Sequence, residues 1–453
     1  MTCCGGRAPC AVSEPRRDTG SAQVSFRLDR ARRGCDDPAV AADGEGQGSA
    51  VVDEAEALEP AGRSGRSAFV FAAMVAAIYA LSHPQAGSPY DQTFLFARTL
   101  LGGDLGIDHP RDWLELVPGE RLHYSVFPLG AVVTMMPAAA LSAAGWFAAV
   151  PVAWLAAVIG GAAAFFAWRL AEGVPASAGQ RLLLATFPVL GTWMWANVLN
   201  GGAWQLALGF AVVGLLGAFH FSLRMPRPLL CGAFFALAFG NRTELILAAP
   251  LFAGLLIEKS DAPRWSHDNF TRVASFCVVP FLLGVATLAY NFARFHSIFD
   301  FGYERIPFLL DDPFYADGFF SWRGIEPNLR VMLLRPWAPH GEFPWVRPTG
   351  TGESILLVSP AILLCLRPAS RHRLHSALAA VYIFILTAVL WLHGNAGGYQ
   401  FAYRYGMILV PFVFWMLLES SPKRPRVVDG VLYLVSFLAN AWGVYAFYWG
   451  RLV

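Results

Sequence analysis

From residue 67 onwards the chain alternates long apolar stretches with short polar ones. Residues 182–223 and 374–403 contain no Asp, Glu, Lys or Arg, and a helix that spans a bilayer needs about 20 apolar residues. The pattern therefore predicts an all-α polytopic membrane protein. The apolar segments are 67–82, 127–145, 148–170, 182–199, 203–222, 228–240, 243–258, 272–291, 353–366, 374–393, 403–418 and 428–448.

Composition supports this class. The chain has 453 residues, of which 56% are hydrophobic and 15% charged, whereas soluble proteins carry roughly 25% charged residues. The net charge of +2 gives no reason to expect nucleic acid as a partner. Residues 1–66 are polar and poor in aromatic residues, so we expect a disordered cytoplasmic tail. A single membrane domain, 67–453, follows it.

The positions of Lys and Arg predict the topology, because these residues are in excess in cytoplasmic loops. Six basic groups fall on the same side only if segment 127–145 does not cross the membrane. That segment contains Pro128 and Pro137, and we expect it to lie in the outer interface. The prediction is a multi-pass plasma-membrane protein with about eleven spans, a cytoplasmic N-terminus and two long outer loops, 83–147 and 292–352. The basic groups are Arg63/Arg66, Arg169/Arg181, Arg224/Arg227, Lys259/Arg264/Arg272, Arg367/Arg371/Arg373 and Lys423/Arg424/Arg426.

Asp91 is the first candidate for chemistry, since it lies in the loop just beyond the first apolar segment. A carboxylate there can act as a general base. It can also be an ordinary N-cap of a helix that starts near Gln92, because Asp is a favoured N-cap residue. We expect most other acids of the same loop to be solvated. These are Asp104, Asp108, Asp112, Glu115 and Glu120.

Two arginines stand at the ends of apolar segments predicted to face outward. Arg242 separates two short apolar segments, and Arg404 begins another. Ionisable groups at membrane depth usually face a cavity or a partner, so both are candidates for binding a phosphate. The alternatives are an internal Arg242–Glu244 pair or a snorkelling Arg242 side chain. Tyr405 beside Arg404 is also typical of an interfacial aromatic belt.

Several stretches, in this order, resemble the GT-C superfamily of membrane glycosyltransferases, which includes protein O-mannosyltransferases and the lipid A aminoarabinose transferase. The resemblance covers roughly residues 67–450. The stretches are PYDQ (89–92), GGDLGID (102–108), YSVFPLG (124–130), AFGNRTE (238–244), YNFARFHSIFDFGY (290–303), Ser359–Pro360 and QFAYRY (400–405).

The resemblance implies an inverting glycosyltransferase that uses a polyprenyl-phosphate sugar within the membrane. Asp91 would be the general base, and Arg242 or Arg404 would hold the donor phosphate, with Arg294 and Tyr303 as further contacts. Asp108 would contact the acceptor, whose nature (glycan, lipid or protein) the sequence does not indicate.

Relatives often carry a Lys just before the proline that corresponds to Pro128. Here Ser125, Val126 and Phe127 stand at those positions. His123 or Arg121 would therefore replace that phosphate contact.

Other activities fit the pattern less well. The chain has no G-x-x-x-x-G-K-[ST] phosphate loop and no His/Cys cluster, so we expect no cofactor. A divalent cation held by Asp91 and a second acid is compatible with the pattern. A transporter or lipid flippase is one alternative and would have internal repeats and broken helices. The other is a non-catalytic assembly subunit with the same fold.

Overall fold

The computed structural model describes residues 61–83, 87–109, 111 and 114–453 of the chain. This part is 66% helical and 4% strand, which confirms the prediction of a mostly helical protein. The first helix begins at Ala61, earlier than the predicted residue 67. The tail prediction for residues 1–60 lies outside the described part.

The N-terminal half holds ten α-helices, one short π-helix, one 3₁₀ helix and a β-hairpin in its described part. They are α1 (Ala61–Ser82), α2 (Gln92–Leu101), β1 (Leu116–Pro118), β2 (His123–Ser125), α3 (Leu129–Ala143), α4 (Val152–Ala171), α5 (Ala178–Leu190), α6 (Met194–Leu199), α7 (Ala203–Phe219), the π-helix η1 (His220–Arg224), α8 (Pro228–Asn241), the 3₁₀ helix η2 (Thr243–Ala248), α9 (Ala249–Glu258) and α10 (His267–Phe295).

The C-terminal half begins with an irregular region rich in 3₁₀ turns. It contains η3 (Tyr303–Arg305), η4 (Leu309–Asp311), η5 (Pro313–Tyr315), η6 (Trp322–Gly324), α11 (Ile325–Leu329), the π-helix η7 (Arg330–Leu334), β3 (Ala338–Pro339), β4 (Val346–Arg347), α12 (Ile355–Val358), η8 (Pro360–Leu366), α13 (Arg373–Leu392), η9 (Arg404–Leu409), α14 (Val410–Ser420) and α15 (Val427–Tyr448). Both two-stranded sheets, β1–β2 and β3–β4, are antiparallel.

Six helices in the described residues are long and apolar enough to cross a membrane. They are Gly65–Ser82 of α1, α4, α7 with η1, α10, α13 and α15. The segment expected to stay at the interface forms α3, a shorter apolar helix of 15 residues.

Four predicted apolar segments are interrupted rather than continuous. Segment 182–199 divides between α5 and α6, 243–258 between η2 and α9, 353–366 between α12 and η8, and 403–418 between η9 and α14. In the last three, Pro250, Pro360 and Pro411 stand in the first turn of the second piece. Proline fits the first turn because it lacks the N–H that a helix interior needs.

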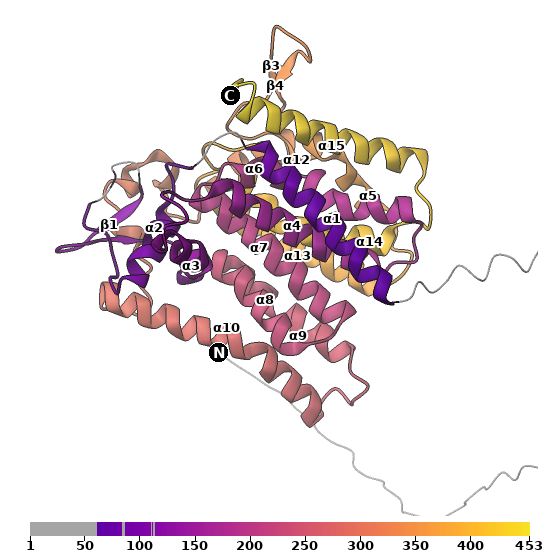
Figure 1. Ribbon diagram of the computed structural model, residues 1–453, viewed down its shortest axis with the longest axis horizontal. Helices are drawn as coiled ribbons and strands as arrows, with labels where there is room; N and C mark the ends of the chain where they lie inside the picture. The colour runs from indigo at the N-terminus through magenta and orange to yellow at the C-terminus, as the bar shows by residue number, and fades with distance from the viewer. Residues whose placement is uncertain (1–60, 84–86, 110, 112–113) are drawn as a thin grey trace, which may run out of the picture. The chain divides into compact units, whose positions relative to one another are not determined.

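Small residues allow the helices to approach closely. Gly160 of α4 faces the Tyr79 ring of α1, where an added Cβ would lie 2.7 Å from the ring. The Tyr79 hydroxyl donates to the Val189 carbonyl of α5 at 2.6 Å. Further along the chain, α8 packs against α7 and α10. Figure 1 shows α2, α3 and β1 gathered at one end of these helices.

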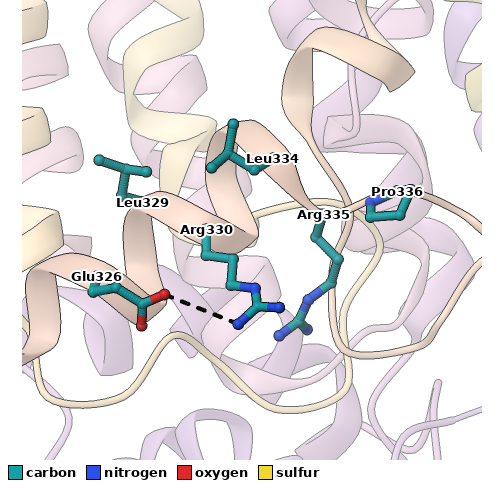
Figure 2. Close-up of a pocket in the computed structure, with 6 residues that line it drawn as sticks. All are labelled: Glu326, Leu329, Arg330, Leu334, Arg335 and Pro336. Carbon is teal, nitrogen blue, oxygen red and sulfur yellow. Dashed lines mark ion pairs between the residues drawn. The ribbon is translucent and has the colours of Figure 1, made fainter.

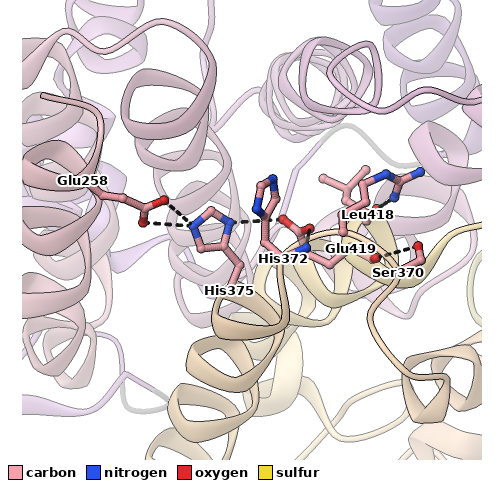
Figure 3. Close-up of polar contacts among 7 residues, drawn as sticks. Glu258, Ser370, His372, His375, Leu418 and Glu419 are labelled. Carbon is pink, nitrogen blue, oxygen red and sulfur yellow. Dashed lines mark hydrogen bonds and ion pairs between the residues drawn. The ribbon is translucent and has the colours of Figure 1, made fainter. Parts of the chain in front are cut away.

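A polar cluster formed by buried His375 and Glu419 and exposed Glu258 joins three helix ends. His375, at the start of α13, places Nε2 3.0 Å from Glu258 at the end of α9. Its Nδ1 lies 3.3 Å from Glu419 at the end of α14, and Figure 3 shows the imidazole between the two carboxylates. The helices α9, α13 and α14 therefore meet at this end, which we call the His375 end.

We expect His375→Ala to lower the thermal unfolding temperature of the purified protein. The substitution leaves the buried Glu419 carboxylate without the imidazole, and an unsatisfied buried polar group costs about 1–3 kcal/mol. His372→Ala is the matched control, because His372 is exposed and only its backbone N–H is bonded to Glu419. Equal shifts in the two variants would contradict this assignment.

Candidate functional site

At the opposite ends of α9 and α14 the structure brings two predicted phosphate-binding residues to one place. Arg242 immediately precedes η2, which leads into α9, and Arg404 begins η9, which leads into α14. The guanidinium carbons of Arg242 and Arg404 lie 5.3 Å and 5.1 Å from the centre of the Tyr405 ring. Both guanidinium groups lie within cation–π range of the same ring, and guanidinium groups are suited to binding a phosphate.

The two arginines differ in how their charges are paired. Arg242 forms an ion pair of 2.8 Å with Glu244, so the predicted internal pair exists. Arg404 is buried and donates to the Tyr405 hydroxyl at 3.3 Å. Its Nε is buried without a hydrogen-bond partner among the residues that the structure describes. A buried donor left unpaired is costly, which makes Arg404 the stronger candidate for a ligand contact.

Aromatic residues from the second long loop and from the turn after α13 complete the surroundings. The His393 ring lies 5.4 Å from the Tyr405 ring and 6.1 Å from the Tyr315 ring. Desolvation by the surrounding protein raises the pKa of the Tyr303 hydroxyl to about 12, although part of the side chain is exposed, and the Arg242 charge opposes that rise. Burial lowers the pKa of His393, which therefore favours the neutral imidazole.

Glu115 also belongs with these residues, although the sequence did not single it out from the other acids of its loop. It stands just before β1, and its side chain is exposed. The carboxyl is nevertheless surrounded by enough protein to be partly desolvated, which raises its pKa, and the Arg404 charge opposes that rise. No local pattern separates Glu115 from the other acids of the loop; the fold brings it close enough for the Arg404 charge to act on it. We call Glu115, Arg242, Glu244, Tyr303, His393, Arg404 and Tyr405 the arginine cluster.

Asp91 occupies the N-cap position of α2, but its side chain makes no capping hydrogen bond. The carboxylate instead pairs with Arg111 at 2.9 Å and is buried. Burial raises the pKa of Asp91, while the charge of Arg111 opposes that rise. The ring of the preceding residue, Tyr90, makes a tilted contact with the Trp204 ring, with their centres 5.6 Å apart, and the guanidinium carbon of Arg404 lies 5.9 Å from the centre of the Trp204 ring. Asp91 is thus linked to the arginine cluster through two aromatic contacts.

Four other predicted site residues lie elsewhere. Arg294 is buried and donates to the Ser125 carbonyl and to Asn291 Oδ1, so its guanidinium ties the end of α10 to β2. His123 belongs to β2, and Arg121 and Asp108 are exposed. Within the described ranges, no hydrogen bond, ion pair or ring contact joins these four residues to the arginine cluster.

We expect Arg294→Gln to lower the unfolding temperature without changing the KM for a donor in the protein that remains folded. The guanidinium bonds connect elements 169 residues apart, and their loss leaves buried polar groups unpaired at about 1–3 kcal/mol. Thermal unfolding and donor titration measure the two effects. The control is Arg305→Gln, whose arginine is 53% exposed and pairs with Asp300. A raised KM without loss of stability would instead place Arg294 in the donor site.

A divalent cation was compatible with the sequence, but among the residues described no group of three or more His, Cys, Asp or Glu is arranged to hold a metal ion. Comparison with known proteins adds no assignment: no protein-family model matches the chain, and neither a curated protein nor a solved structure matches it significantly. The functional argument therefore rests on the residues of the arginine cluster and on Asp91.

Proposed function

We propose that the protein is a GT-C-type glycosyltransferase that moves a sugar from a polyprenyl-phosphate donor to an acceptor hydroxyl. The observation that carries the proposal is the convergence of Arg242 and Arg404 on Tyr405, beside the loop that holds Asp91. Paired arginines are suited to a phosphate because each guanidinium can offer two parallel N–H donors. The donor lipid would enter from the bilayer, and the acceptor from water.

The proposed reaction assigns each group one task. Asp91 accepts the proton of the acceptor hydroxyl, and the resulting oxygen attacks the anomeric carbon. The bond between that carbon and the phosphate oxygen breaks, and polyprenyl phosphate leaves with an additional negative charge. Arg404 and Arg242 stabilise that charge as it develops. Arg111 must release the Asp91 carboxylate for the base to act.

The proposed topology has about eleven spans, with the arginine cluster on the outer side of a plasma membrane. The support is that α9, α13 and α14 each run from this cluster to the His375 end. Arg371, at the His375 end, also contacts the Leu418 and Ser421 carbonyls. It belongs to one of the basic groups that the positive-inside rule assigns to the cytoplasm.

A transporter is the second candidate, because the structure contains the broken helices that such a protein would have. Residues 242–250 and 404–411 are similar: an arginine lies just before or at the start of a 3₁₀ helix of six residues, and an α-helix with proline in its first turn follows. Such paired half-helices also surround ion and substrate sites in transporters.

The deciding experiment incubates the purified protein with a small panel of polyprenyl-phosphate sugars and measures released polyprenyl phosphate. Release, by transfer to an added acceptor or by slow hydrolysis, supports the transferase. The same protein in liposomes is tested for movement of the labelled lipid between leaflets. Movement without release would replace the proposal with the transporter.

A further inference from the structure

A basic hollow lies on the surface of α11 and η7, apart from the arginine cluster. Its volume is about 530 Å³, and Figure 2 shows Arg330 and Arg335 extending side by side. The lining residues are Glu326, Leu329, Arg330, Leu334, Arg335 and Pro336. The hollow thus combines two guanidinium groups and one carboxylate with an apolar wall.

The hollow and the arginine cluster lie on opposite faces of α11. Asn328 donates to the His393 carbonyl at 2.7 Å and accepts from the Tyr403 hydroxyl at 2.8 Å. Glu326 and Arg330, one turn apart on a helix and about 200° around the axis from Asn328, line the hollow. A ligand in the hollow would therefore be separate from the proposed sugar donor.

The depth of the hollow follows from the contacts that α11 and η7 make with α13, a candidate membrane span that ends at Leu392. Asn328 also reaches the Trp391 carbonyl at 3.4 Å, and the Trp391 indole donates to Met332 at 3.2 Å. The hollow therefore lies at the level where an apolar span ends. Leu334 on its wall is 65% exposed, as expected for a side chain that meets lipid.

The charged side chains Arg330 and Glu326 of the hollow interact only weakly with each other. Arg330 lies 4.0 Å from Glu326, and both side chains are mostly exposed. Exposed pairs of this kind contribute little. Arg335 donates to the Thr351 hydroxyl at 2.9 Å, which holds its side chain beside Arg330. Two arginines at a membrane boundary are suited to the phosphate of a lipid headgroup.

We propose that this hollow binds the phosphate of an anionic membrane phospholipid. Arg330 and Arg335 contact the phosphate oxygens, and Leu329 and Leu334 contact the first part of an acyl chain. The site is independent of the proposed transferase activity, because it needs neither a sugar nor the arginine cluster.

The test titrates the purified full-length protein, in a non-ionic detergent, with dioctanoyl phosphatidylglycerol. Arg330→Gln is expected to weaken binding about tenfold or more, the effect of losing one charge-assisted hydrogen bond. Glu326→Gln removes the competing carboxylate and is expected to tighten binding about two- to fivefold. Arg323→Gln is the matched control, because Arg323 is 79% exposed, pairs with Asp317 and does not line the hollow.

Dioctanoyl phosphatidylcholine and farnesyl phosphate complete the design. Weak phosphatidylcholine binding, with opposite effects of Arg330→Gln and Glu326→Gln, supports the proposal. An unchanged affinity in Arg330→Gln, an equal loss in Arg323→Gln, or equal binding of phosphatidylcholine would overturn it. Farnesyl phosphate binding more tightly, with the same dependence on Arg330, would also overturn it and make the hollow an entrance for the donor. The opposite change expected from Glu326→Gln keeps the test decisive if Arg330→Gln does not fold.

Discussion

Asp91→Asn is expected to reduce sugar transfer at least about 100-fold while the protein still binds its donor, because proton transfer by a positioned base contributes roughly that factor or more. Asn has nearly the same shape but cannot accept the proton. The structural cost should be small, since the partner Arg111 is 39% exposed and can be solvated. Initial rates of polyprenyl phosphate release and a donor titration measure the two quantities.

Two other acids of the same loop make this prediction specific. Asp104 is exposed, so Asp104→Asn should leave the rate unchanged. Glu115 lies in the arginine cluster, and Glu115→Gln tests whether it is the base instead. A full rate in Asp91→Asn together with a large loss in Glu115→Gln would move the base to Glu115.

The pH profile gives a second signature of the same base. A base must be deprotonated to act, and burial raises the pKa of Asp91. The rate of the wild type should therefore fall, as the pH is lowered, at a higher pH than an ordinary carboxyl would give. The residual rate of Asp91→Asn should lack this decline.

Removal of either cluster arginine is expected to lower kcat/KM by about 10²–10³, the cost of losing one donor to charge that develops in the transition state. For Arg242 the informative variant is Arg242→Gln/Glu244→Gln. The single substitution would leave Glu244 as a poorly exposed carboxylate without its partner, which destabilises a protein by itself. For Arg404, Arg404→Lys keeps the charge but removes the planar fork, so the loss should be smaller than in Arg404→Gln.

Controls separate phosphate binding from general electrostatics. Glu244→Gln alone keeps Arg242 and should retain most activity. Arg121→Gln removes an exposed arginine of the β1–β2 hairpin and should change nothing. Full activity of Arg242→Gln/Glu244→Gln, or a loss in Arg121→Gln as large as in Arg404→Gln, would exclude the arginine cluster as the donor phosphate site.

The resemblance to glycosyltransferases and the structure support the proposal in different ways. The resemblance pointed to Arg242 and Arg404 from separate short motifs. The structure places both guanidinium groups over Tyr405 and adds Glu115 and His393 around it. In the structure Arg294 donates to the Ser125 carbonyl instead. This predicted phosphate contact is therefore not part of the arginine cluster.

The sequence by itself determined that the protein is mostly helical, with apolar helices long enough to cross a membrane, and it determined the positions of the main helices. Length and hydrophobicity are local properties, so a run of apolar residues predicts a helix wherever the chain takes it. The start of α2 at Gln92 and the end of α8 at Asn241 follow from the polar residues at those boundaries. Hydrophobicity could not show the breaks between α12 and η8 or between η9 and α14, because both pieces of each segment are apolar.

Only the tertiary structure decided which polar side chains meet. Arg294 bonds to Ser125, 169 residues away, and the charge of Arg404 acts on Glu115. Asp91 pairs with Arg111 instead of capping its own helix. The physical reason is that helix packing sets the distances between such groups: burial is unfavourable for an unpaired charge, and the nearest partner in space is rarely the nearest in sequence.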